Sequence, residues 1–187
     1  VLARQATDAV IVGVEFQAEM AEMAERNVQL NGLAELIGIV CDDVLALQQR
    51  YPVSSFDLVV ANPPYRKPGS GRISPKEGRD VARHETTAGL ADFLKVAKYL
   101  VKPMGRICFI YHPGRLMEFC ATAAALKLAL LRLRMVHGDA GAEARMVLLE
   151  LAKGRKGELA VWPPLFIYGN DAKCNGEMIR IPGEEDA

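Results

Sequence analysis

The stretch from Phe56 to Tyr65 has the sequence Phe-Asp-Leu-Val-Val-Ala-Asn-Pro-Pro-Tyr. Its apolar run predicts a buried strand that ends abruptly, because two consecutive prolines lack backbone donors and cannot continue a central strand. The turn that follows presents the Asn62 amide, the Pro63 carbonyl and an aromatic ring at the carboxyl end of the strand. Ligands of open α/β sheets bind outside this end. The stretch therefore predicts both a strand of such a sheet and a candidate site.

Helix-like and strand-like segments alternate on both sides of this stretch. Upstream, the hydrophobic pattern predicts a strand at 9–15, a helix at 16–30, a strand at 36–40 and a short helix at 44–50. Downstream, it predicts helices at 87–101 and 116–126, a turn at 102–105, and strands at 106–111, 131–136 and 145–151. The alternation predicts an α/β fold with a doubly wound, mostly parallel sheet. The strand at 145–151 is expected to be antiparallel to its neighbour.

Composition limits the classes of protein to which the chain can belong. Its 187 residues are enough for one domain with a hydrophobic core. The formal net charge of zero excludes a surface coated with positive charge, but not a local basic patch. No apolar stretch is long enough for a transmembrane helix, so we expect no membrane partner. The four cysteines lack the spacing of a zinc site, and we expect reduced thiols, no bound metal and a cytoplasmic location.

The segment at 63–83 is long, basic, and rich in glycine and proline. A loop of this length inside a compact domain is usually functional or mobile. Its cations are Arg66, Lys67, Arg72, Lys76, Arg79 and Arg83, against the acids Glu77 and Asp80. They could contact phosphates of a nucleic acid, although a solvated loop would have the same composition.

Two acidic positions follow the strands that precede this stretch. Glu15 ends the strand at 9–15, and a carboxylate in this position can accept hydrogen bonds from two ribose hydroxyls. An acid at the start of a helix is the structural alternative, because the helix dipole favours it there. Asp42 and Asp43 follow the strand at 36–40, and we expect one of them to cap the helix at Val44. Two adjacent acids without further ligands do not predict a metal site.

Taken in order, these motifs resemble the Rossmann-like, class I methyltransferases that depend on S-adenosylmethionine. More narrowly, they resemble the amino-group branch, which carries Asn/Asp-Pro-Pro-Tyr/Phe after the fourth strand. The resemblance covers roughly residues 9–153. It implies a catalytic motif made of Asn62, Pro63, Pro64 and Tyr65. It implies a cofactor site made of Glu15, Phe16, Asp42, Asp43, Val44 and Asn62.

Within that branch, the motif followed by Arg79 and by Ala82-Arg83-His84-Glu85 is similar to bacterial tRNA(Val) adenine-N6 methyltransferases. This similarity implies tRNA as the partner and N6 of an adenine as the methyl acceptor. The implied substrate contacts are Arg66, Lys67, Arg79, Arg83 and Glu85. A glutamine amide of a protein such as a release factor is the nearest alternative acceptor. A DNA adenine methyltransferase and a non-catalytic Rossmann-like binding module are further alternatives.

The resemblance also predicts that a part of the fold is absent. The family has a first strand, placed between its second and fourth strands, and a glycine-rich loop that meets the cofactor. Neither is visible in the sequence, so we expect residues 1–187 to form a single methyltransferase domain truncated at its amino terminus. A sheet without that strand would keep two unpaired inner edges. Residues 158–187 are expected to add short strands and turns, with a hairpin near Asn175 and Gly176.

Overall fold

The computed structural model describes residues 8–63, 88–155 and 157–168. Its first part contains β1 (Ile11–Glu15), α2 (Ala18–Leu30), β2 (Ile37–Cys41), the 3₁₀ turn η1 (Val44–Ala46), α3 (Leu47–Arg50) and β3 (Phe56–Ala61). Its second part contains α4 (Leu90–Leu100), β4 (Val101–Tyr111), the 3₁₀ turn η2 (Pro113–Arg115), α5 (Leu116–Ala125), β5 (Leu128–His137), β6 (Ala144–Lys153), β7 (Ala160–Val161) and β8 (Leu165–Phe166). The predicted alternation of strands and helices is confirmed.

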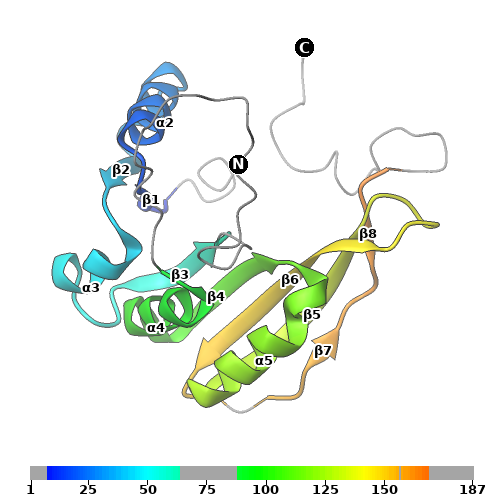
Figure 1. The fold of residues 1–187 in the computed structure, drawn as a ribbon. Helices are drawn as coiled ribbons and strands as arrows, with labels where there is room; N and C mark the ends of the chain where they lie inside the picture. Colours follow the sequence, from blue (N-terminus) through cyan, green and yellow to red (C-terminus); the bar gives the residue numbers. More distant parts are fainter. Residues whose placement is uncertain (1–7, 64–87, 156, 169–187) are drawn as a thin grey trace, which may run out of the picture.

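The strands form two sheets (Figure 1). The small sheet pairs β1 with β2 in parallel. The large sheet has the order β3-β4-β6-β5-β7, and β8 also pairs with β5. In it β3 is parallel to β4, while β6 is antiparallel to both β4 and β5. The expected antiparallel strand near the carboxyl terminus is therefore β6.

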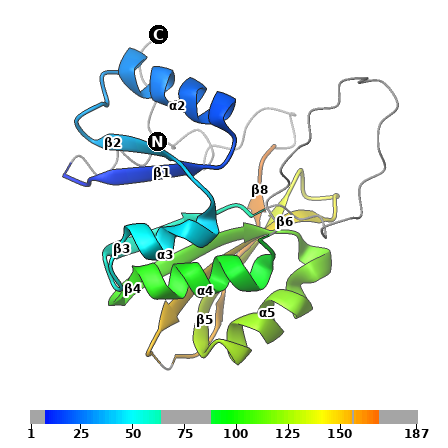
Figure 2. The same ribbon diagram turned by 60° about the vertical axis from the view of Figure 1, so that its left-hand side comes forward.

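β1 and β3 each have one edge with no partner within the part of the chain that the structure describes. β1 pairs only with β2, and β3 pairs only with β4. In both views of the ribbon, β1 is the strand of the small sheet that lies nearer to β3 (Figures 1 and 2). The family resemblance places a further strand between these two edges.

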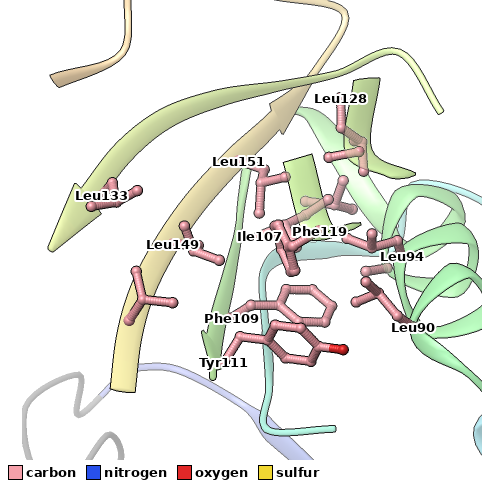
Figure 3. Close-up of a cluster of buried hydrophobic side chains, with 14 residues drawn as sticks. Leu90, Leu94, Ile107, Phe109, Tyr111, Phe119, Leu128, Leu133, Leu149 and Leu151 are labelled. Atoms are coloured by element: carbon pink, nitrogen blue, oxygen red, sulfur yellow. The ribbon is translucent and has the colours of Figure 1, made fainter. Parts of the chain in front are cut away.

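The main core lies between one face of the large sheet and the helices α4 and α5 (Figure 2). Strand alternation points every second side chain of β4 and β6 to this face. Figure 3 shows the resulting cluster, in which aromatic rings of β4 lie beside leucines of α4. The fully buried large side chains are Tyr111, Phe109, Phe119, Leu94, Ile107, Leu151, Val101 and Val147. This core fixes the strands on which the Asn-Pro turn depends.

The small sheet has much less buried surface. No residue of β1 or β2 is fully buried, and Ala21 is the buried residue of α2. The connection to the large sheet is better packed, because Leu47 of α3 forms a second cluster with Val96 and Leu100 of α4. No helix among residues 8–63, 88–155 and 157–168 is long and apolar enough to cross a membrane.

A charged cluster lies on the sheet strands β4, β6 and β5. The Glu150 carboxylate forms an ion pair with Arg106, whose Nε lies 2.7 Å away, and accepts a hydrogen bond from Arg132 Nη1 at 3.1 Å. The Arg132 guanidinium also lies 5.0 Å from the ring centre of Trp162. Burial raises the pKa of the neighbouring Cys108 thiol, and the Glu150 charge raises it further. The cluster links three adjacent strands by side-chain contacts in addition to the backbone ladder.

Three sequence predictions differ in detail from the structure. The strand at 56–61 is not buried as predicted, because β3 pairs only with β4 among the described residues and none of its residues is fully buried. The turn predicted at 102–105 lies inside the range of β4, where it forms a break in the pairing. Val101 pairs with Phe56 and Arg106 pairs with Leu58, so residues 102–105 bulge opposite Asp57 and bring Gly105 close to it. Gly105 permits the approach, since a Cβ there would lie 2.6 Å from the Asp57 carbonyl oxygen. The helix predicted from residue 87 begins at Leu90, after an N-cap at Gly89 whose N–H donates to the Asp92 carboxylate at 3.1 Å. The hairpin predicted near residue 175 lies outside the described residues.

Candidate functional site

The predicted site residues that the structure describes lie at or just after the carboxyl ends of β1, β2 and β3. Each of these strands pairs in parallel with a neighbour. Glu15 is the last residue of β1 and pairs in register with Cys41, the last residue of β2. Asp42 and Asp43 follow directly, so the predicted acids of the two strands lie at one edge of the small sheet. Asn62 follows β3 in the large sheet.

The Glu15 carboxylate is oriented by the backbone that follows it. Its Oε1 accepts from Gln17 N–H at 2.9 Å, and Gln17 is the N-cap of α2. The Glu15 carbonyl accepts from Asp42 N–H at 3.1 Å, which ties the ends of β1 and β2 together. Both alternatives considered for Glu15 therefore hold in its geometry. Its carboxylate supports the start of α2, and it lies at the end of β1.

The two aspartates after β2 have different contacts. Asp43 is the N-cap of η1, and its Oδ1 accepts from Leu45 N–H at 2.9 Å. Asp42 Oδ1 accepts from Asp43 N–H at 2.8 Å, and its second oxygen lies 3.7 Å from Arg50 Nη1. The capping role expected of one aspartate therefore belongs to Asp43.

The other two predicted cofactor residues flank these acids. Phe16 is half-buried, and its carbonyl lies 3.9 Å from Cys41 Sγ. The Val44 side chain packs against the cluster around Leu47. Only the Val44 backbone therefore faces the end of β2. Both residues therefore belong to the frame on which the acids are held.

The two residues of the Asn-Pro turn differ in burial. Asn62 is exposed, whereas Pro63 is buried. Ala61, the last residue of β3, is in register with Phe109 of β4 and packs against the main core. The turn thus holds an amide side chain at the surface from a rigid base.

The remaining predicted site residues lie outside the described residues. They are Pro64 and Tyr65 of the motif, and Arg66, Lys67, Arg79, Arg83 and Glu85 of the basic segment. Their roles stay predictions from the sequence.

An arginine that was not among the predicted site residues also lies at this edge. Tyr111, the last residue of β4, is 1% exposed, and its ring lies 5.4 Å from that of Phe119. The Arg115 guanidinium lies 5.4 Å from the Tyr111 ring centre. It also donates to both oxygens of Glu118, from Nε at 2.9 Å and from Nη2 at 2.8 Å. The spacing of three residues at a predicted helix start could have indicated this ion pair.

His112, next along the chain, is also fixed by its local backbone. Its Nδ1 accepts from Gly114 N–H at 3.1 Å and so caps η2. Within the described ranges, no three residues of the types that bind metals are grouped closely enough to hold an ion.

A family model described as N-6 DNA Methylase matches residues 2–138. The chain belongs to this family. The resemblance to amino-group methyltransferases, inferred from the Asn-Pro-Pro-Tyr motif and the strand-end acids, is thereby confirmed at the level of the family.

Curated relatives agree with this assignment. A tRNA1(Val) (adenine(37)-N6)-methyltransferase of Porphyromonas gingivalis is 32% identical over 151 residues, which are 80% of this chain and 58% of the relative. A protein of the same name from Aeromonas salmonicida is 28% identical, over 84% of this chain and 66% of the relative. The chain thus spans less than two thirds of the length of these relatives.

A solved structure supports the fold. The chain is similar to a predicted O-methyltransferase from Agrobacterium tumefaciens, with a TM-score of 0.73 and 20% identity. The similarity covers 95% of this chain and 78% of that protein. The predicted Rossmann-like methyltransferase fold is confirmed.

Proposed function

We propose that this protein transfers a methyl group from S-adenosylmethionine to N6 of an adenine in tRNA. The observation that carries the proposal is the exposed Asn62 on a buried Pro63, at the end of a parallel strand, in a chain of the N-6 methylase family. The names of the two curated relatives support tRNA as the acceptor. A tRNA acceptor is consistent with the cytoplasmic location expected from the sequence. We also propose that residues 1–187 act as part of one methyltransferase domain.

The Asn-Pro turn suits the chemistry of an exocyclic amino group. This nitrogen is a weak nucleophile because its lone pair is delocalised into the base. The Asn62 side-chain oxygen and the Pro63 carbonyl can each accept one of its N–H groups, which favours a tetrahedral nitrogen with its lone pair directed at the methyl carbon. Catalysis then rests on positioning and on preorganised dipoles.

The bonds, electrons and proton of the methyl transfer are all accounted for without a strong base. The new bond joins the amino nitrogen to the methyl carbon as the carbon–sulfur bond breaks and its electron pair stays on sulfur. The nitrogen, positively charged after the transfer, releases its proton to solvent. No redox partner is needed.

The acids at the small sheet fit the nucleoside part of the cofactor. S-adenosylmethionine supplies an activated methyl group on a sulfonium, and its ribose and adenine carry hydrogen-bond donors. Carboxylate oxygens accept from such donors, so Glu15 suits the ribose hydroxyls and Asp42 or Asp43 suits the adenine amino group. The backbone bonds to Glu15, Asp42 and Asp43 hold these carboxylates in place before the ligand arrives.

Replacing Glu15 with glutamine is expected to weaken S-adenosylmethionine binding about 10- to 100-fold, because hydrogen bonds to a charged acceptor are worth about 1.5–3 kcal/mol. Isothermal titration calorimetry measures the change. Glu22→Gln is the matched control, since Glu22 is exposed on α2, away from the strand ends. Equal affinities for the two variants would remove Glu15 from the cofactor site.

Transfer of a labelled methyl group tests the acceptor. We expect label in total tRNA and none in a release factor or in duplex DNA. Label in the release factor alone would instead assign the glutamine amide, which the Asn-Pro turn serves equally well. No cofactor heat and no thermal shift with S-adenosylmethionine would favour the non-catalytic binding module.

A further inference from the structure

The start of β6 contains a bulge. In the pairing of β5 with β6, Val136 is opposite Met146, and the next residue, His137, is opposite Ala144. Arg145 is therefore an extra residue on β6 that has no paired residue on β5. Bulges of this kind are frequent next to active sites, where they change the direction of a side chain.

The bulge lies at the same edge of the large sheet as the Asn-Pro turn. β6 is antiparallel to β4, and Val147 is in register with Tyr111, the last residue of β4. Arg145 thus lies two residues further toward that edge. Since β3, β4 and β6 are consecutive strands about 4.8 Å apart, Arg145 lies about 10 Å to the side of the line of β3.

Arg145 differs from the other arginines on the strands and edge of the large sheet. Arg106 and Arg132 pair with Glu150, Arg115 pairs with Glu118, and Arg134 donates to the Pro163 carbonyl. Arg145 is exposed and forms no ion pair with any residue that the structure describes. Among the described residues, no carboxylate competes with a ligand for its guanidinium.

The turn that leads into the bulge is held by its own contacts. His137 Nδ1–H donates to the Ala142 carbonyl at 2.8 Å, and the His137 ring lies 5.5 Å from that of Phe166. Gly141 N–H donates to the Asp139 carboxylate at 2.8 Å. Arg145 therefore extends from an ordered support, which lowers the entropic cost of a specific contact.

We propose that Arg145 binds a backbone phosphate of the RNA beside the base held at Asn62. The proposal rests on the proposed function. An adenine with its amino group at the Asn-Pro turn has its sugar and phosphate on the far side of the base, and Arg145 lies to the side of this turn at the same edge of the sheet. Phosphate contacts of this type position a nucleic acid and are independent of its sequence.

Arg145→Gln is expected to weaken tRNA binding and to raise the KM for tRNA, each about tenfold, with kcat nearly unchanged. The slope of log K against log salt should fall by about one unit, as for the loss of one phosphate contact. Arg145→Lys should keep the slope, because a phosphate also accepts from an ammonium. Fluorescence anisotropy with a tRNA transcript between about 50 and 200 mM salt measures both quantities.

Arg155→Gln is the matched control, because Arg155 is exposed just past the opposite end of the same strand. Equal affinity and equal salt slope for Arg145→Gln and Arg155→Gln would overturn the proposal. A fall in melting temperature without a change in slope would do the same. Failure of the unsubstituted protein to methylate tRNA would overturn the proposed function, whereas the binding measurement tests Arg145 separately.

Discussion

Asn62→Ala is expected to lower kcat for methyl transfer about 10²- to 10³-fold. The substitution removes one of the two acceptors that fix the amino group, and loss of one preorganised hydrogen-bonding group has a cost of this size in other enzymes. Affinity for S-adenosylmethionine should be largely kept, because the acids proposed to bind it lie at the ends of β1 and β2. Single-turnover methylation of tRNA measures the first quantity, and calorimetry measures the second.

The separation of these two effects is the informative result. Asn27→Ala is a suitable control, since Asn27 is an exposed asparagine on α2. A loss of cofactor binding equal to the loss of turnover would mean that Asn62 acts mainly through the cofactor. Unchanged turnover would mean that the Asn-Pro turn is a structural strand end and that the amino group is held elsewhere.

Phe119→Ala is expected to lower the free energy of unfolding by about 3–5 kcal/mol, the usual cost of a large aromatic cavity in a core. Phe119 is fully buried, and its ring contacts Phe109 at 5.5 Å and Tyr111 at 5.4 Å between ring centres. A loss of this size is a large part of the stability of an ordinary domain. Urea unfolding followed by circular dichroism measures it.

Met117 supplies the comparison on the same helix. It is 82% exposed, so Met117→Ala should change the unfolding free energy by no more than about 0.5 kcal/mol. Similar losses for the two variants would show that α5 does not pack as described. Because Ala61, which precedes the Asn-Pro turn, packs against this core cluster, Phe119→Ala should also reduce turnover at temperatures where the protein is still folded.

The strand that carries the site could be predicted from its own residues. An apolar run closed by two prolines has few alternatives, and β3 is the strand expected at 56–61. The cap at Asp43 follows from the chemistry of a short polar side chain before a helix. These features depend on neighbours in the sequence, and the sequence was sufficient for them.

Features that depend on pairing could not be predicted in this way. The bulge at Arg145 exists only in the register of β6 with β5, and the pattern of β6 alone predicts an ordinary strand. Residues 102–105 have the composition of a turn, but the strand β4 continues on both sides of them, so they form a bulge opposite Asp57, with Lys102 Nζ 2.7 Å from the Asp57 carboxylate. In both places the pairing of neighbouring strands decides where the bulge lies, and the residues of the single strand do not show it.

The uneven burial of the two sheets has a consequence for how strongly the protein holds its methyl donor. Local opening is easiest where few apolar side chains are buried, and in the small sheet and its helix Ala21 is the buried one among the described residues. The acids proposed to bind the donor, Glu15, Asp42 and Asp43, thus lie where opening is easiest, whereas Asn62 follows a strand of the sheet that carries the main core. A donor that binds only the closed form loses apparent affinity in proportion to the open fraction. Substitutions that tighten α2 against β1 and β2 should therefore strengthen donor binding without contacting the donor.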